Sequence, residues 1–169
     1  MKLKRLNTIG YEGATLNDFL LTLQHARVTT LLDVRELAIS RRKGFSKSAL
    51  KAALGSVGIV YRHERALGAP RHIRHRLRRD GNFERYSADF REYLATQKSL
   101  VGELATELTG RVALLCFERD PQQCHRSVVA AALAKRAGVG VRDLFVERQD
   151  AKQGSARADS RSRQSVSAA

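Results

Sequence analysis

The strongest indication of the fold class comes from residues 112–138, "VALLCFERDPQQCHRSVVAAALAKRAG". Residues 112–117 are a continuous apolar run, which is typical of a central parallel strand that is covered on both faces. A polar loop follows, and an apolar, alanine-rich segment then runs from His125 to Gly138, as expected of a helix. A buried strand followed by a helix is the repeating unit of α/β proteins.

The same alternation continues along the rest of the chain. Further strands are predicted at residues 5–11, 29–35, 59–64 and 141–146. Further helices are predicted at residues 15–26, 46–54 and 86–108, with Thr15 and Ser46 as N-caps of the first two. The segment 67–85 shows no convincing period. We therefore expect an α/β fold, a single three-layer domain with a mostly parallel open sheet of about five strands and helices on both faces.

Composition agrees with one globular domain and a tail. The 169 residues are 43% hydrophobic and 28% charged, which is ordinary for a soluble protein. We expect residues 1–149 to form the domain and residues 150–169, rich in Ser, Arg and Ala, to form a disordered basic tail. No stretch reads as a signal peptide or a membrane helix, so we predict a cytoplasmic protein without a membrane partner.

The formal net charge of +14 favours an anionic partner, either a phosphate-bearing small molecule or a nucleic acid. The densest run of positive charge precedes the aromatic residues Phe83 and Tyr86, a combination that suits phosphate contacts and base stacking. Alternatively, this run covers a substrate as a lid. The candidate nucleic-acid-binding residues are Arg71, Arg74, Arg76, Arg78 and Arg79.

Ligands of open α/β sheets bind beyond the carboxyl ends of the strands. Polar residues follow several of the predicted strands, and the loop at residues 40–46 adds basic side chains before a helix N-terminus, which attracts anions. The candidate anion-binding residues are Tyr11, Arg35, Ser40, Arg41, His125 and Arg126. Neither a Walker loop nor a Gly-x-Gly-x-x-Gly motif occurs, and we predict no cofactor.

Cys124 is a candidate nucleophile, because a helix N-terminus and the nearby Arg126 are expected to lower the pKa of its thiol. Glu118 is the second candidate catalytic residue, as a general base; the alternative is an ion pair with Arg35 or Arg126. Cys116 ends an apolar run and is expected in the core. Seven residues separate the two cysteines without a Cys-x-x-Cys motif, which is not zinc spacing, so we predict no metal site.

Four ordered motifs resemble the family catalogued as domain of unknown function 488: "TIGYEG" (8–13), "LLDVRELAISRRKGF" (31–45), "GIVYRHERALGAP" (58–70) and "LLCFERDPQQCHRSVVAAAL" (114–133). The resemblance spans residues 7–146. It implies a compact α/β fold with a site at Arg35, Ser40, Arg41, Glu118, Cys124, His125 and Arg126. It brings no established reaction.

Three functions are compatible with these residues. The first is a phosphate-, anion- or nucleotide-binding site at the carboxyl ends of the strands, with or without catalysis. The second is a nonenzymatic nucleic-acid-binding module that uses residues 71–79. The third is a thiol-dependent enzyme that uses Cys124.

Overall fold

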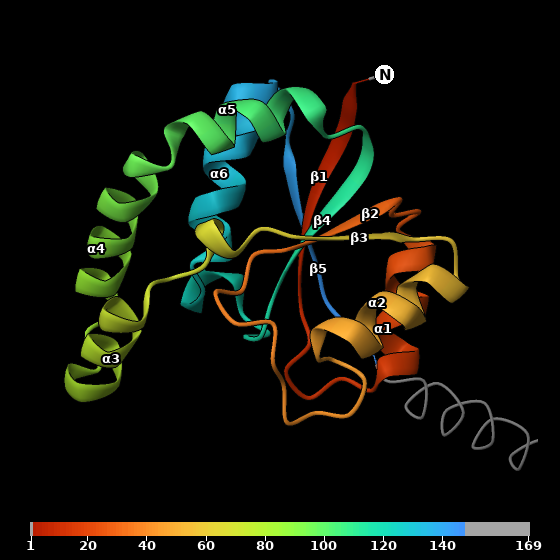
Figure 1. The fold of residues 1–169 in the computed structure, drawn as a ribbon, viewed down its shortest axis with the longest axis horizontal. Coiled ribbons are helices and arrows are strands. Elements are labelled where there is room, and N and C mark those ends of the chain that lie inside the picture. Colours follow the sequence, from red (N-terminus) through yellow and green to blue (C-terminus); the bar gives the residue numbers. More distant parts are fainter. Residues whose placement is uncertain (1, 148–169) are drawn as a thin grey trace, which may run out of the picture.

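The computed structural model describes residues 2–147 and contains a five-stranded, all-parallel sheet (Figure 1). The strands lie in the order β3-β2-β4-β1-β5. Their bounds are β1 Leu3–Gly10, β2 Thr30–Asp33, β3 Val60–His63, β4 Gly110–Cys116 and β5 Val141–Leu144. The tail predicted at residues 150–169 lies outside the described residues.

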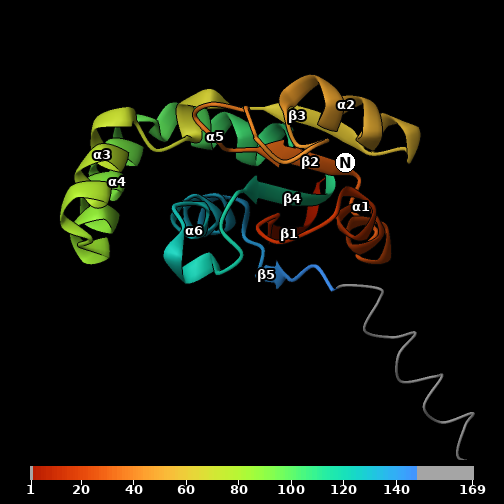
Figure 2. The same ribbon diagram turned by 90° about the horizontal axis from the view of Figure 1, so that it is seen from below.

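Helices cover both faces of the sheet, which confirms the predicted three-layer α/β fold. One face carries α1 Leu16–His25 and α2 Lys47–Ser56. The other carries α3 Arg71–Asp80, α4 Phe83–Thr96, α5 Lys98–Glu107 and α6 Arg126–Ala137. In Figure 2 the sheet separates α1 and α2 from α5 and α6, and α3 and α4 lie farther out. None of the helices within residues 2–147 has the length and apolar character of a membrane-spanning segment.

Strand β4 explains why the apolar run at residues 112–117 indicates the fold. It lies between β1 and β2 in the sheet. Val112 and Leu114 pack into the core cluster under α3–α6, whereas Ala113 and Leu115 pack into the cluster under α1 and α2. Successive side chains of a strand point to opposite faces, so a strand buried on both faces must be apolar throughout.

The segment without a convincing period contains helix α3. Its apolar face consists of Ile73, which is buried, and Leu77 four residues later, which packs partly buried against the same core. Two apolar residues among arginines and histidines give a weak pattern, although i and i+4 lie on one face of a helix. Gly81, with φ +64°, provides the left-handed residue that ends the helix.

The single helix predicted at residues 86–108 is in fact two, α4 and α5, which meet at Gln97. Helix α4 also begins earlier than predicted, because the Asn82 side chain caps it by accepting the Arg85 N–H at 2.9 Å. Phe90 and Leu104 belong to the same core cluster. The chain changes direction between the two helices, but both apolar faces pack on the same core. The spacing of apolar residues therefore stays almost continuous, and the sequence pattern does not reveal the break.

The two predicted N-caps differ. The Thr15 hydroxyl accepts the Asp18 N–H at 3.1 Å and caps α1 as expected. Ser46 precedes α2 but makes no capping bond. Its hydroxyl instead accepts the Ser40 N–H and donates to the Ser40 carbonyl, both at 3.1 Å, and so closes the loop between residues 40 and 46.

Candidate functional site

A pocket of about 810 Å³ lies where β1, β2 and β4 end. The loop after β2 and helix α3 form much of its wall. Of the residues predicted for the site, it contains Tyr11, Arg35, Ser40, Arg41, Glu118 and His125, together with Arg74 and Arg78 from α3. Sequence reasoning did not select its apolar lining, which includes Leu37, Ile39, Leu77 and Phe117. The one sequence feature that indicates this apolar lining is the pair Leu37 and Ile39, two apolar residues in an otherwise polar, basic loop.

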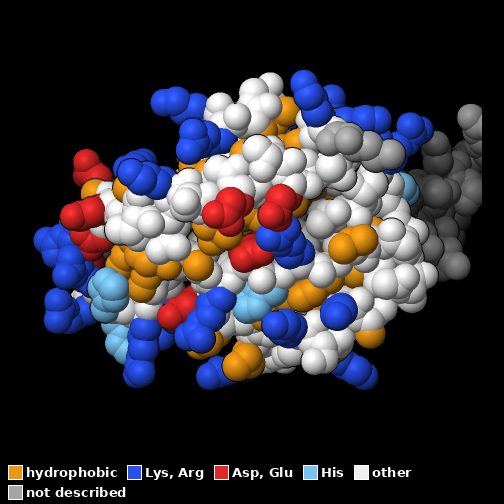
Figure 3. Space-filling model, turned by 45° about the horizontal axis from the view of Figure 1, so that its top comes forward, with side chains coloured by type: hydrophobic (Ala, Val, Ile, Leu, Met, Phe, Trp, Pro, Cys, Tyr) orange, Lys and Arg blue, Asp and Glu red, His pale blue; other side chains and the backbone are white. Residues whose placement is uncertain are grey.

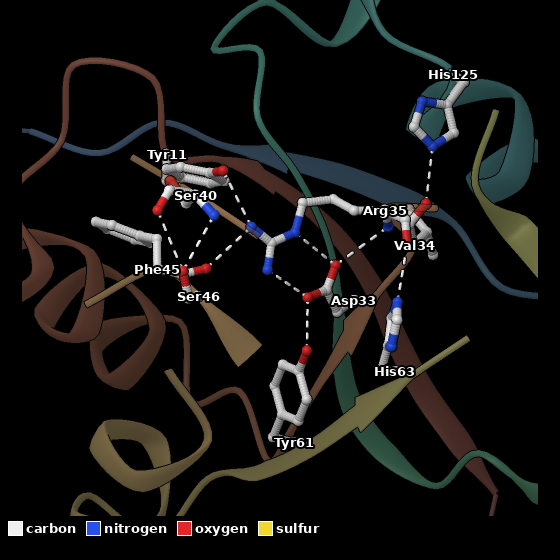
Figure 4. A network of polar contacts seen from close by, with 10 residues as sticks. All are labelled: Tyr11, Asp33, Val34, Arg35, Ser40, Phe45, Ser46, Tyr61, His63 and His125. Atoms are coloured by element: carbon white, nitrogen blue, oxygen red, sulfur yellow. Dashed lines mark hydrogen bonds and ion pairs between the residues drawn. The ribbon is translucent and has the colours of Figure 1, made fainter. Parts of the chain in front are cut away.

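Arg35 lies at the centre of a buried polar network (Figure 4). Its Nε and Nη2 donate to the two carboxylate oxygens of Asp33 at 2.8 and 2.6 Å. Its Nη1 donates to the Tyr11 hydroxyl and to the Phe45 carbonyl, each at 3.0 Å. These bonds use four of the five guanidinium N–H groups, and Asp33 neutralises the charge. Arg35 therefore fixes Tyr11 and the loop at the strand end, and little of it is free for an anion.

The same network raises two pKa values. Burial lowers the pKa of Arg35, but the hydrogen bonds and charge of Asp33 raise it by more, so the guanidinium stays protonated. Burial and a 2.7 Å hydrogen bond to Asp33 raise the pKa of Tyr61, which keeps its phenol protonated and donating.

Two guanidinium groups in the pocket wall are unpaired within residues 2–147. Arg41, in the loop after β2, and Arg78, on α3, are exposed and have no hydrogen-bond or ion-pair partner there. Their neighbours are engaged. Arg42 donates to the Ala14 carbonyl at 2.5 Å, and Arg74 forms an ion pair with Glu36.

A cluster of two thiols and one imidazole lies at the end of β4. His125 Nδ1 is 3.8 Å from Cys116 Sγ and 3.9 Å from Cys124 Sγ. His125 Nε2 is 2.9 Å from the Val34 carbonyl oxygen (Figure 4). Because a carbonyl only accepts, Nε2 carries the proton and Nδ1 faces the sulfurs. Cys116 is buried, as predicted, but it also lines the pocket.

The expected lowering of the Cys124 pKa is wrong in direction. Burial, followed by the neighbouring Cys116, raises this pKa well above its ordinary value, and His125 offsets only part of the rise. Helix α6 begins at Arg126 with His125 at its N-cap, so Cys124 precedes the cap. The Cys124 side chain is 1% exposed and does not line the pocket.

The pKa of His125 is also raised, but here the neighbouring groups outweigh the effect of burial. Burial lowers its pKa, but the hydrogen bonds to Cys124 and Val34, together with the charge of Glu118, raise it by more. The imidazole therefore binds a proton more readily than a free histidine does.

Arg126 does not line the pocket, although it was predicted to bind the anion. It is completely buried, and its guanidinium donates to Thr8 Oγ1 and to the carbonyls of Glu118 and Arg119 at 3.2, 2.5 and 3.0 Å. The predicted ion pair of Glu118 with Arg35 or Arg126 is absent from the described residues. The Glu118 carboxylate instead accepts from Cys116 Sγ at 3.2 Å. Arg126 thus holds the loop after β4 against β1.

The arginines predicted to bind nucleic acid have different surroundings. Arg74 and Arg76 are paired with Glu36 and Asp89, respectively. Arg71 Nε donates to the His75 ring at 3.4 Å, and Arg79 is exposed. Figure 3 shows acidic side chains among the Lys and Arg residues of this face rather than an uninterrupted basic surface.

Comparison with known proteins gives one match. The sequence profile of the family described as "Domain of unknown function DUF488" matches residues 15–133, which lie within the 7–146 span of the resemblance noted above. Neither the curated proteins nor the solved structures contain a match. A profile match over most of the chain establishes membership, so the chain belongs to the DUF488 family.

Proposed function

We propose that the chain binds a phosphate-bearing small molecule with a planar ring, such as a nucleotide, in the pocket at the carboxyl ends of β1, β2 and β4. The observation that carries this proposal is that two guanidinium groups lining the same pocket, those of Arg41 and Arg78, have no partner within residues 2–147. Guanidinium groups bind phosphate oxygens through charge-assisted, often bidentate, hydrogen bonds. Arg35 supports this site indirectly, because its bonds hold Tyr11 and the Phe45 carbonyl in place.

The size and lining of the pocket support a ligand with an apolar part. Its volume of about 810 Å³ lies within the range of small-molecule sites. Leu37, Ile39 and Phe117 line the pocket and are 50%, 75% and 41% exposed, so they offer apolar surface to a ligand. The Phe117 ring also meets the Tyr11 ring edge-on, with centroids 5.3 Å apart. A planar base can cover this apolar rim while its phosphate meets the arginines.

Titration calorimetry with nucleoside monophosphates, the matching nucleosides and inorganic phosphate tests the proposal. We expect R41A and R78A each to weaken monophosphate binding about tenfold, as the loss of one charge-assisted contact implies. R79A is the matched control. It removes the same charge from the same helix as R78A, but Arg79 does not line the pocket. Equal loss in R78A and R79A, or no binding of any phosphate compound by the unmodified chain, would refute the pocket as the anion site.

A nucleic-acid-binding function is the second candidate, favoured by the net charge of +14 and by the exposed Arg71 and Arg79 on α3. This function predicts that variants of α3 arginines outside the pocket lose binding as well. Single-stranded RNA would bind with an affinity that falls steeply with salt, and R71A and R79A would weaken that binding as much as R78A. The thiol-enzyme alternative has less support, since the Cys124 pKa is raised and its thiol lies outside the pocket lining.

A further inference from the structure

Two cysteines and a histidine converge at the end of β4, although seven residues separate the cysteines in the sequence. The short helical turn Pro121–Gln123 folds the chain back, so that Cys124 and His125 return to Cys116. Cys116 Sγ, Cys124 Sγ and His125 Nδ1 all lie within 4.8 Å of one another. We propose that these three residues bind a zinc ion. This site is separate from Arg41 and Arg78 and runs against the sequence-based prediction of no metal site.

The two sulfur-to-nitrogen distances are close to those of tetrahedral coordination. With Zn–S and Zn–N bonds of about 2.3 and 2.05 Å, tetrahedral angles place a sulfur about 3.6 Å from the nitrogen and two sulfurs about 3.8 Å apart. The two sulfur-to-Nδ1 distances are 3.8 and 3.9 Å. Shifts of a few tenths of an ångström bring each sulfur to its bonding distance from the nitrogen. The two sulfurs, which lie within 4.8 Å of each other, need to approach by at most about 1 Å, which side-chain rotation allows.

The surroundings of the cluster match those of metal ligands. A zinc-bound histidine usually donates its other ring N–H to a carbonyl or carboxylate, and His125 Nε2 donates to the Val34 carbonyl at 2.9 Å. The Phe90 ring packs edge-on against the imidazole, with centroids 5.0 Å apart. The Arg126 backbone N–H points to Cys124 Sγ at 3.5 Å. Nδ1 is therefore fixed toward the sulfurs before any ion binds.

The ligand atoms select the class of ion. Thiolate and imidazole suit Zn²⁺, whereas Mg²⁺ and Ca²⁺ require oxygen ligands. Zn²⁺ also cancels the charge of two thiolates, so the buried cluster carries no net charge when the ion is bound. Its fourth position is adjacent to the pocket, which Cys116 and His125 line. Glu118, which accepts from Cys116 Sγ at 3.2 Å, loses that donor when the metal displaces the proton and becomes available as a ligand.

Cobalt titration of the reduced full-length chain tests the site, because Co²⁺ reports both sulfur ligation and tetrahedral geometry. We expect one Co²⁺ per chain, sulfur-to-cobalt charge transfer in the near ultraviolet, visible bands typical of a tetrahedral ion, and displacement by Zn²⁺. Zinc uptake should release the thiol protons in proportion. C116S, C124S and H125Q should each weaken zinc binding at least about tenfold.

H63Q is the matched control, since His63 Nε2 also bonds a backbone carbonyl, that of Arg35 at 2.8 Å, with no sulfur beside it. It should bind zinc like the unmodified chain. X-ray absorption of the unmodified zinc-loaded chain, which should show two sulfurs, decides the matter even where a variant fails to fold. R41A and R78A should retain the metal, so failure of the anion proposal leaves this one standing.

Three results would overturn the proposal. The first is a fully reduced chain that gives no sulfur-to-cobalt absorption. The second is a zinc shell without sulfur. The third is zinc affinity unchanged in both serine variants. If the purified chain contains a Cys116–Cys124 disulfide, it is reduced before the titration, and a reduced chain that still gives no cobalt spectrum refutes the site.

Discussion

Replacing Asp33 by Asn tests whether its buried ion pair with Arg35 holds the pocket wall. Asp33 is completely buried and accepts four hydrogen bonds, from Arg35 N, Nε and Nη2 and from the Tyr61 hydroxyl. An amide here presents N–H groups to donors and leaves the Arg35 charge without a counter-ion. Breaking one side of a buried pair costs about 3–5 kcal/mol. For a domain of this size that lowers Tm by about 6–20 °C.

Urea unfolding followed by circular dichroism measures the loss in D33N. D89N is the control, because the Asp89–Arg76 pair is partly exposed and should contribute at most about 1 kcal/mol. The double variant D33L/R35M removes both charges and should recover much of the stability lost in D33N. A D33N loss no larger than that of D89N would contradict the view that this pair is a buried, essential contact.

Two further predictions concern Gly10, the last residue of β1, and Tyr61, in β3. A Cβ at Gly10 would lie 1.8 Å from the Glu118 carbonyl oxygen, so G10A should lower the unfolding free energy by about 3 kcal/mol or more. At Gly55 an added Cβ would meet open space within residues 2–147, so G55A should instead be neutral or stabilising by up to about 1 kcal/mol; equal effects in urea unfolding would rule out the close approach. Because the pKa of Tyr61 is raised, its contribution to stability is complete below about pH 10 and is lost as pH rises further, so Y61F should show a smaller alkaline decrease in unfolding free energy. An identical pH dependence in Y61F would contradict that assignment.

The convergence of the site residues has a simple origin. Parallel strands present all their carboxyl ends at one edge, so residues that follow β1, β2 and β4 meet whatever their separation in sequence. The pocket accordingly brings together Tyr11, Arg35 and His125. What each of them does there depends on its partners. Arg35 and Arg41 are both arginines after β2, yet the first is neutralised by Asp33 and the second is unpaired within residues 2–147.

The sequence alone determined the α/β class and the edge of the sheet at which the candidate site residues gather. Burial on both faces forces residues 112–116 to be apolar, and such local patterns are visible in one dimension. The tertiary structure decided the rest. It turned Arg126 inward, moved Cys124 ahead of the α6 cap, and brought Cys116 beside His125. These outcomes depend on which groups fold beside each other, because burial, counter-ions and hydrogen-bond partners come from segments far apart in the chain.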